Sequence, residues 1–352
     1  MKRNLLLLSF ISVLLTFLIP FSAGAETSGI CGTNLTWALD DRGTLTINGT
    51  GEMTQYSSGS SPWYSLRSSI KVINISQGVS SIGARAFQEC TSLSSIIIPD
   101  GVTFIGDRAF EGCSSLSDIT IPSSVFAIGS YAFSGCASLT SISLPDTITS
   151  IGKDAFLGCT SLSVIEIPDA VTSIGSSAFQ GCSSLPSIII PVGVTHISSK
   201  AFKDCTTLAT INLSTSVGSV ADGAFWGCTA LTTINYEGSE NDFSLISIDY
   251  GNDPLENATI NYNVQIPKIT STKSTCISNK ITVVPHNVKN GSYIVVACYN
   301  GKKLAEIFPM TYNGEESLPF NPDVAFDRVA VMVWESDSSL TPLCAYESVI
   351  VK

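Results

Sequence analysis

The chain has 352 residues and a formal net charge of −11, with 44% hydrophobic and 13% charged residues. This acidic balance argues against a nucleic-acid-binding protein, because neutralising phosphates requires a basic surface. The length is ample for a large core, which we expect to be divided between one long repeat unit and one small domain.

Residues 1–25 have the pattern of a secretory signal. Lys2 and Arg3 precede an apolar run at 5–19, and small residues follow at 23–25. The alternative, a membrane anchor, is disfavoured because a spanning helix needs about 20 apolar residues. We therefore expect cleavage before Glu26 and a mature protein with no membrane span, secreted to the extracellular space and able to associate with a cell surface.

Residues 26–65 do not follow the repeat that comes after them, and we interpret them as an N-terminal cap. The segments 35–39 and 44–47 have the composition of two short strands, and the turn residues at 40–43 join them.

Two aromatic residues end this cap. Trp63 and Tyr64 fall 23 residues before Ala86 and Phe87, the first copy of a recurring pair, which predicts a half-formed first repeat. The two side chains could form a binding platform. A capping role is favoured, because an exposed solenoid end needs a cover.

Residues 66–236 repeat one phrase every 23 residues, AFxxCxxL followed by IxIP and VxxIG. A unit of this length cannot enclose its own core, so each copy must pack its apolar side chains against the next copy. This predicts a mainly β solenoid whose core consists of ladders of equivalent residues. The two most regular columns are Phe87, Phe110, Phe133, Phe156, Phe179, Phe202 and Phe225, and Cys90, Cys113, Cys136, Cys159, Cys182, Cys205 and Cys228.

Within one repeat, Leu93, Ile96 and Ile98 have the spacing of a leucine-rich-repeat strand, and Val102 and Ile105 form a second short apolar segment. The full pattern, LxxIxIPxxVxxIGxxAFxxC, resembles the BspA-type (treponemal-type) class of bacterial leucine-rich repeats. The resemblance implies a leucine-rich-repeat solenoid and a role in adhesion to host, matrix or microbial surface proteins.

A glycine follows the second apolar segment, at Gly106 in the second full repeat, and we expect it to allow a tight turn into the Ala-Phe bend. Ser198 and Ala221 occupy the same column in later repeats. The position therefore requires a small residue rather than strictly a positive φ.

Eleven cysteines in a secreted chain would ordinarily indicate disulfides. The seven in the repeats are expected to be unpaired, because equivalent side chains of neighbouring coils run parallel, which suits disulfide geometry poorly. We predict that they fill the turn beneath each Phe as small buried hydrophobes. The cysteines of a linear ladder also do not converge on one point, as the ligands of a zinc site must. The remaining four, whose pairing the sequence leaves open, are Cys31, Cys276, Cys298 and Cys344.

Residues 237–263 are expected to form a closing coil, the C-terminal cap, in which the repeat decays. The run Asp249, Asn252 and Asp253 is acidic, but its spacing does not match a calcium loop, so we interpret it as a solvated turn. The apolar residues of this coil are Phe243, Ile246, Ile248, Leu255 and Ile260.

Residues 264–352 change to short alternating strands. Asn300-Gly301 is a strong hairpin signal, because both residues tolerate the positive φ of a type I′ turn. We predict a small β-sandwich of immunoglobulin or fibronectin type.

The residues do not favour catalysis. The only histidines are His196, in a variable repeat column and interpreted as a surface substitution, and His286, at a strand end. Neither accompanies a nucleophile motif, and the sequence has no phosphate-binding glycine loop and no metal-ligand cluster. We therefore expect a protein that is not an enzyme and uses no cofactor or metal.

The side chains between the ladder residues of LxxIxI face outward, which defines two columns. Most are small and polar, so eight strands about 4.8 Å apart would make a flat, hydrogen-bonding face roughly 34 Å long. An equally weighted alternative is that these residues are simply compatible with strands. The first column is Val72, Ser95, Asp118, Ser141, Val164, Ser187, Thr210 and Thr233, and the second is Asn74, Ile97, Thr120, Ser143, Glu166, Ile189, Asn212 and Asn235. The candidate partner-binding residues are Ile97, Asp118, Thr120, Ser141, Ser143, Val164, Glu166 and Ile189.

We thus expect a non-catalytic, monomeric protein that uses this sheet face to bind an extracellular or cell-surface protein. Two alternatives remain. A glycan-binding module would place exposed aromatics on the face, and the columns contain none. A structural spacer would instead present the C-terminal β-sandwich as the active surface.

Overall fold

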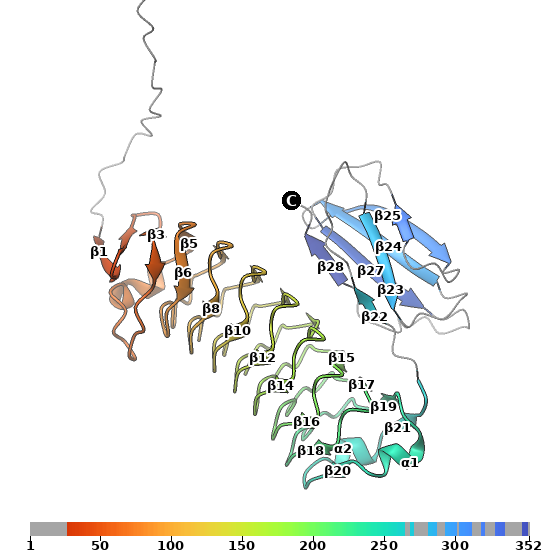
Figure 1. The fold of residues 1–352 in the computed structure, drawn as a ribbon. Helices are drawn as coiled ribbons and strands as arrows, with labels where there is room; N and C mark the ends of the chain where they lie inside the picture. Colours follow the sequence, from red (N-terminus) through yellow and green to blue (C-terminus); the bar gives the residue numbers. More distant parts are fainter. Residues whose placement is uncertain are drawn as a thin grey trace, which may run out of the picture.

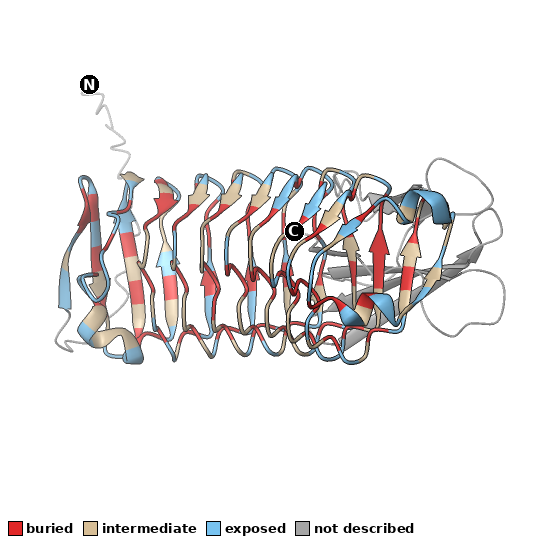
Figure 2. Ribbon diagram, turned by 90° about the horizontal axis from the view of Figure 1, so that it is seen from below, coloured by how far each residue is buried: buried red, intermediate tan, exposed pale blue. Residues whose placement is uncertain are grey.

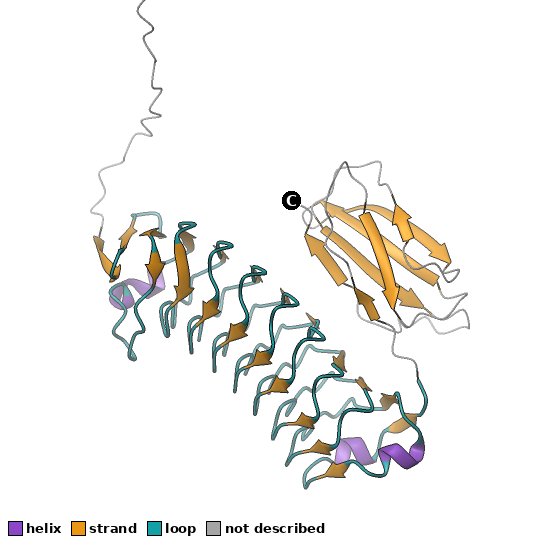
Figure 3. Ribbon diagram, in the orientation of Figure 1, coloured by secondary structure: helices purple, strands orange, loops and turns teal. Residues whose placement is uncertain are grey.

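The computed structural model describes residues 27–264 in full and, between 268 and 350, the backbone of seven further strands. Residues 27–264 form an elongated solenoid of stacked coils (Figure 1). A typical coil has two short strands and a turn, so the solenoid has a first edge and a second edge of strands and a turn edge (Figure 3). The mainly β solenoid predicted from the 23-residue period is confirmed. The expected signal at 1–25 lies outside the described residues.

The first edge carries the strands expected from LxxIxI, and within each sheet the repeat strands pair in parallel with their equivalents in adjacent coils. The register is that of the repeat, since Ile142 lies opposite both Ile119 and Ile165. The hydrogen bonding is divided among three sheets, ordered β1-β2-β3-β5-β7, β13-β11-β9 and β15-β17-β19-β21. The repeat strands are β5 (Val72–Ile75), β7 (Ser95–Ile97), β9 (Asp118–Thr120), β11 (Ser141–Ser143), β13 (Val164–Ile165), β15 (Ser187–Ile190), β17 (Thr210–Leu213), β19 (Thr233–Tyr236) and β21 (Thr259–Asn261).

The second edge was expected only as a short apolar segment, yet it also forms parallel strands. They belong to two sheets, ordered β14-β12-β10-β8-β6-β4 and β16-β18-β20. In the second sheet His196 is exposed and lies beside Ser219, which agrees with a surface substitution. The strands are β4 (Gly51–Glu52), β6 (Val79–Ile82), β8 (Phe104–Ile105), β10 (Ala127–Ile128), β12 (Ser150–Ile151), β14 (Ser173–Ile174), β16 (His196–Ile197), β18 (Ser219–Val220) and β20 (Ser247–Ile248).

The core runs along the solenoid axis, with buried residues in every coil (Figure 2). The phenylalanines are fully buried and stack face to face, with ring centroids 5.3–5.5 Å apart and interplanar angles of 4–7° between Phe110 and Phe225. From Phe87 to Phe202, each Phe backbone N–H donates to the Ala carbonyl of the next coil, as Phe156 does to Ala178 over 2.8 Å. The predicted ladder is therefore held by ring stacking and by a backbone hydrogen bond.

The repeat cysteines are buried free thiols, as predicted. From Cys113 onward each Sγ donates to a Phe carbonyl of the preceding coil, for example Cys159 to Phe133 over 3.1 Å. Cys31 is also buried and unpaired. The side chains of the other three cysteines lie outside the described residues.

The N-terminal cap contains the two expected strands, β2 (Leu35–Leu39) and β3 (Thr44–Gly49), paired in antiparallel fashion. An additional strand, β1 (Thr27–Gly32), covers β2, and β3 pairs in parallel with the first repeat strand. The cap thus converts an antiparallel sheet into the parallel ladder of the solenoid.

Trp63 supplies the first ring of the stack, which corrects the expected alignment by one residue. It is fully buried and lies 5.7 Å from Phe87, with an interplanar angle of 18°. Tyr64, which the period aligns with Phe87, instead begins a short 3-10 helix, Tyr64–Ser69, and stays partly exposed. The reason is a hydrogen bond: the Trp63 indole N–H donates to the Ala86 carbonyl over 2.7 Å and replaces the backbone donor of a preceding coil.

The closing coil contains α1 (Glu240–Phe243), β20, α2 (Asp253–Glu256) and β21. The solvated turn expected at 249–253 is wrong for Asn252, which is 1% exposed. Its side-chain oxygen accepts from the Phe225 N–H over 3.0 Å, and its Nδ2 donates to the carbonyls of Ala221 and Asp249. Since no further Ala carbonyl follows the last repeat, the Asn252 side chain takes its place.

The glycine column requires small residues because the backbone of the preceding coil lies close to it, and not because the column has a left-handed backbone. A Cβ on Gly106 would lie 2.5 Å from the Ala84 backbone nitrogen, and Gly106 does not have a positive φ. Ser198 is accommodated later in the column with its Oγ donating to the Ile174 carbonyl. The requirement for a small residue is therefore confirmed.

Beyond the solenoid, the described backbone consists of antiparallel strands in the order β22-β23-β26 and β25-β24-β27-β28. The immunoglobulin or fibronectin type stays a prediction, and the expected turn at Gly301 lies outside the described residues. Within the part of the chain that the structure describes, no helix is long and apolar enough to cross a bilayer. The strands are β22 (Lys268–Thr270), β23 (Ile281–His286), β24 (Tyr293–Asn300), β25 (Lys303–Thr311), β26 (Leu318–Phe320), β27 (Arg328–Trp334) and β28 (Glu347–Ile350).

Candidate binding surface

The outward residues of the first edge form two columns, because the parallel register places equivalent residues side by side. Ser141 lies opposite Asp118 and Val164, and Ser143 lies opposite Thr120. The sheet β9-β11-β13 therefore gathers five of the eight predicted binding residues on one surface. We call the whole outward surface of the first edge, from β5 to β21, the sheet face.

The remaining three predicted residues lie next to this group in the sequence of coils. Ile97 is on β7 and Ile189 on β15, which belong to the neighbouring sheets, and Glu166 directly follows the end of β13. The predicted surface is thus continuous in repeat register but is divided by two breaks in the hydrogen bonding between strands.

The exposure of these side chains decides what they can contact. Ile97 is 76% exposed, an unusual position for a large apolar side chain, while Asp118, Thr120, Ser143 and Glu166 are exposed and Ser141, Val164 and Ile189 are half-buried. The face therefore offers hydroxyl groups, two separate carboxylates and a protruding aliphatic side chain.

At its C-terminal end the sheet face carries an asparagine ladder. Asn235 donates through Nδ2 to Asn212 Oδ1 over 2.9 Å, and Asn261 donates in the same way to Asn235. This arrangement buries Asn212 to 5% exposure, so the expectation that its side chain faces solvent is wrong. The inferred columns ended at Asn235 and missed Asn261, because 26 residues separate these two asparagines instead of 23.

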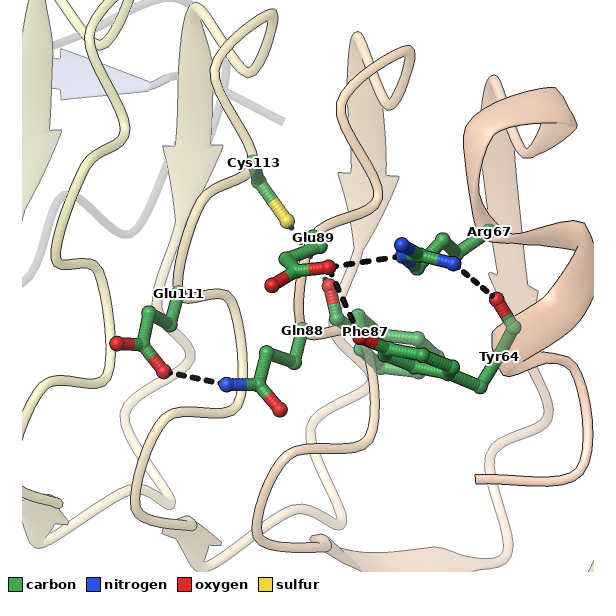
Figure 4. A network of polar contacts seen from close by, with 7 residues as sticks. All are labelled: Tyr64, Arg67, Phe87, Gln88, Glu89, Glu111 and Cys113. Atoms are coloured by element: carbon green, nitrogen blue, oxygen red, sulfur yellow. Dashed lines mark hydrogen bonds and ion pairs between the residues drawn. The ribbon is translucent and has the colours of Figure 1, made fainter. Parts of the chain in front are cut away.

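The turn edge carries a polar network across the first coils (Figure 4). The Glu89 carboxylate accepts from the Tyr64 hydroxyl over 2.9 Å and from Arg67 Nε over 3.0 Å, and the bond to this carboxylate raises the pKa of Tyr64. One coil further, Gln88 Nε2 donates to the Glu111 carboxylate over 2.7 Å. The network therefore joins neighbouring coils, although an exposed ion pair such as Arg67–Glu89 contributes only about 0–1 kcal/mol.

The buried thiols are also unsuited to chemistry. Burial raises the pKa of Cys90 and of Cys159 to about 12, which keeps both thiols protonated at neutral pH and therefore unreactive. His196 is exposed, and its Nδ1 lies 2.7 Å from Ser219 Oγ. Among the residues that the structure describes, no group of three His, Cys, Asp or Glu side chains is placed to hold a metal ion.

The repeat pattern of this chain also occurs in other proteins. The sequence pattern of the BspA type leucine rich repeat region matches residues 60–164 and 149–281, with six copies. No curated protein matches the chain.

Solved structures of bacterial repeat proteins are also similar. A leucine-rich repeat protein of T. pallidum is 30% identical, with a TM-score of 0.44 over 56% of this chain and 87% of that chain. A leucine-rich cell surface protein of Faecalibacterium prausnitzii is 22% identical, with a TM-score of 0.39 over 65% and 99% of the two chains. The pneumococcal vaccine antigen PcpA is 16% identical, with a TM-score of 0.24 over 68% and 88%. Because these superpositions are loose, the assignment to a family rests on the repeat match.

Proposed function

Because the chain belongs to the BspA-type leucine-rich repeat family, we propose that it is a secreted, non-catalytic binding protein whose sheet face binds a protein on a host, matrix or microbial surface. The mature protein acts outside the cell as a monomer. It needs no cofactor and does not bind nucleic acid.

One observation carries this proposal: the sheet face has an exposed aliphatic side chain, Ile97, on the coil that precedes the hydroxyl and carboxylate groups of β9, β11 and β13. An isoleucine that is 76% exposed gains nothing from the fold of the solenoid. In a protein interface it would be covered and would contribute apolar contact, while the hydroxyls around it would supply hydrogen bonds at low entropic cost.

The acidic character of the solenoid also supports the binding of a protein partner. Residues 27–264 contain 20 Asp and Glu and eight Lys and Arg, a balance of −12, while residues 265–352 contain eight of each. A surface of this charge would select a partner with basic character and would bind it more weakly at high salt.

The two alternative functions require different side chains on the sheet face. A glycan-binding module requires exposed aromatic side chains, and both columns of the sheet face lack them. A spacer that presents the C-terminal strands requires no contact at the sheet face at all. These alternatives are therefore separated by substitutions on the face itself.

The test is a binding screen of residues 26–352 against extracellular-matrix proteins, bacterial surface extracts and a glycan array. For a protein that binds through this face, Ile97→Asp and Glu166→Lys should each weaken the affinity about tenfold or more, as expected for residues that carry much of the binding energy. His196→Asp is the matched control, because this exposed side chain lies on the second edge and should leave binding unchanged.

The outcomes distinguish the three functions. Binding that the substitutions on the sheet face do not weaken would contradict the proposal and place the contact elsewhere on the chain, as the spacer requires. Binding to glycans alone would favour the glycan-binding module. A loss with His196→Asp equal to the loss with Ile97→Asp would show a general effect of negative charge and would refute the specific role of the face.

A further inference from the structure

An exposed tryptophan, Trp226, lies on the turn edge in the last repeat, away from the sheet face. Trp226 follows Phe225, in a column that holds Gln88, Glu111, Ser134, Leu157, Gln180 and Lys203 in the other repeats. Its side chain is 49% exposed, whereas Trp37 and Trp63 are buried. The column tolerates polar and charged residues, so the fold does not require an indole at this position.

The closing coil holds this indole in place. Gly251, at φ +80°, packs so closely that a Cβ there would lie 2.8 Å from Trp226 Cε3. The Tyr250 ring meets the indole edge to face, with centroids 6.3 Å apart, and is itself 79% exposed. Two aromatic side chains are thus fixed at the surface without being covered by the described part of the chain.

The indole forms one wall of a hollow between the last repeat and the closing coil. Its volume is about 300 Å³, at the small end of the range of roughly 300–1,000 Å³ for ligand pockets. A hollow of this size accepts a single side chain or one ring, not an extended chain. Among the residues that line it are Trp226, Thr229, Leu231, Asp253, Pro254 and Asn257.

The charge around the hollow selects the kind of ligand. Residues 237–264 contain six acidic residues and no Lys or Arg. The Asp253 carboxylate is exposed at the hollow and makes no hydrogen bond or ion pair within the described residues. On the preceding coil the basic side chains are Lys200, which is exposed, and Lys203, which is paired with Asp204 at 3.9 Å.

We propose that this hollow binds a cationic side chain, lysine or arginine, from a basic segment of a partner protein. The face of Trp226 supplies a cation–π contact and Asp253 supplies the opposite charge. A neutral sugar could also stack on the indole and donate hydroxyl hydrogen bonds to the carboxylate, but the six acidic residues of 237–264, with no Lys or Arg among them, favour a cation. The site goes beyond the sheet face, because it lies on the turn edge and the closing coil.

The experiment titrates the complete mature protein with hexalysine by calorimetry, in parallel with the same peptide carrying an acetyl group on every side-chain amine. The wild type should bind hexalysine, and the binding should weaken as salt is raised, because salt screens the exposed charges. The acetylated peptide, which keeps the length but loses the charges, should not bind. Maltohexaose serves as the neutral sugar.

Two variants locate the binding. Trp226→Gln introduces the residue that Gln88 and Gln180 provide in the same column, so the fold should be kept, which circular dichroism checks. It should weaken hexalysine binding about two- to fivefold, the effect of one cation–π contact at an exposed site. Asp253→Asn should weaken binding to a similar degree and reduce its salt dependence.

Asp146→Asn is the matched control, since it removes the same charge from an exposed turn in a distant repeat. It should leave hexalysine binding close to that of the wild type. The proposal is overturned if the wild type does not bind hexalysine, if Trp226→Gln binds as well as the wild type, or if Asp146→Asn loses as much as Asp253→Asn. Binding of maltohexaose that depends on Trp226 would assign the hollow to sugars instead. None of these results bears on Ile97 and the sheet face, so the two proposals fail independently.

Discussion

The central phenylalanine of the stack tests the core of this solenoid most directly. Phe156 is fully buried, and its ring stacks on Phe133 at 5.5 Å and on Phe179 at 5.3 Å. Phe156→Ala removes both ring contacts and leaves a cavity that the neighbouring coils cannot close, because their backbones are hydrogen-bonded in register. We expect the free energy of unfolding to fall by about 3–5 kcal/mol.

Two further variants separate the ring contacts from the burial of apolar surface. Phe156→Leu keeps most of the apolar volume and loses the two stacked pairs, each worth about 0.5–1.5 kcal/mol, so it should lose about 1–3 kcal/mol. Phe225→Ala should lose less than Phe156→Ala, because the Phe225 ring stacks on Phe202 alone among the described rings, while its backbone N–H keeps the bond to Asn252.

The assay is urea unfolding of residues 26–352, followed by circular dichroism and by tryptophan fluorescence. The slopes of the transitions must agree between variants, because a solenoid can unfold in parts and a changed slope would make the free energies incomparable. A loss below about 1 kcal/mol for Phe156→Ala would refute the phenylalanine column as core. A larger loss for Phe225→Ala than for Phe156→Ala would refute the additive account of the stack.

Four other results are expected. Titration of the unfolded, unreduced protein should find at least seven free thiols, and three or fewer would mean that the cysteine ladder is paired. Burial raises the pKa of Cys90 and Cys159 from 9.0 to about 12, so thiols ionise first in the unfolded chain. The free energy of unfolding should therefore be insensitive to these thiols below pH 9 and fall between about pH 9 and 12, by up to about 1.4 kcal/mol per pH unit for each thiol. Cys159→Val should make that fall shallower, and an unchanged slope would contradict the assignment. Asn252→Ala should cost about 1–3 kcal/mol in urea unfolding, because it leaves the buried Phe225 N–H without an acceptor, whereas a neutral result would mean that water replaces the side chain. Gly129→Ala should cost about 1–3 kcal/mol, since its Cβ would lie 2.7 Å from the Asp107 backbone nitrogen. Gly218→Ala, whose Cβ would meet only Thr195 O at 3.9 Å, is the control and should be nearly neutral.

The repeat period predicts most of the fold, because it aligns the Phe, Cys and Ile columns into ladders. It also predicts the register of the sheet face, in which Ser141 lies opposite Asp118 and Val164. The period does not predict the conformation of individual residues in the turns. The left-handed backbone at Arg108 and Tyr131, just before each Ala-Phe pair, has no compositional signal, since large residues occupy it.

The ends of the solenoid were the least predictable part, because no equivalent residue exists there for comparison. Trp63 enters the ring stack one position early, since its indole N–H reaches the Ala86 carbonyl. Asn252 looked like one polar residue in an acidic run, yet it is buried as the acceptor for Phe225. For Trp226 the signal was available, as the one aromatic in a column of polar and aliphatic residues, but the sequence does not show the hollow beside it.

The similarity of the joints between coils has a genetic consequence. Each joint uses the same ring stack, thiol contact and backbone bond, and Trp63 and Asn252 close the two ends by imitating backbone groups with side chains. A recombination event that deletes or duplicates a whole number of 23-residue units would leave cut ends that fit each other and caps that still find their partners. The number of coils can therefore change in a single event, without a new folding solution, and the reach of the protein becomes a trait on which selection can act.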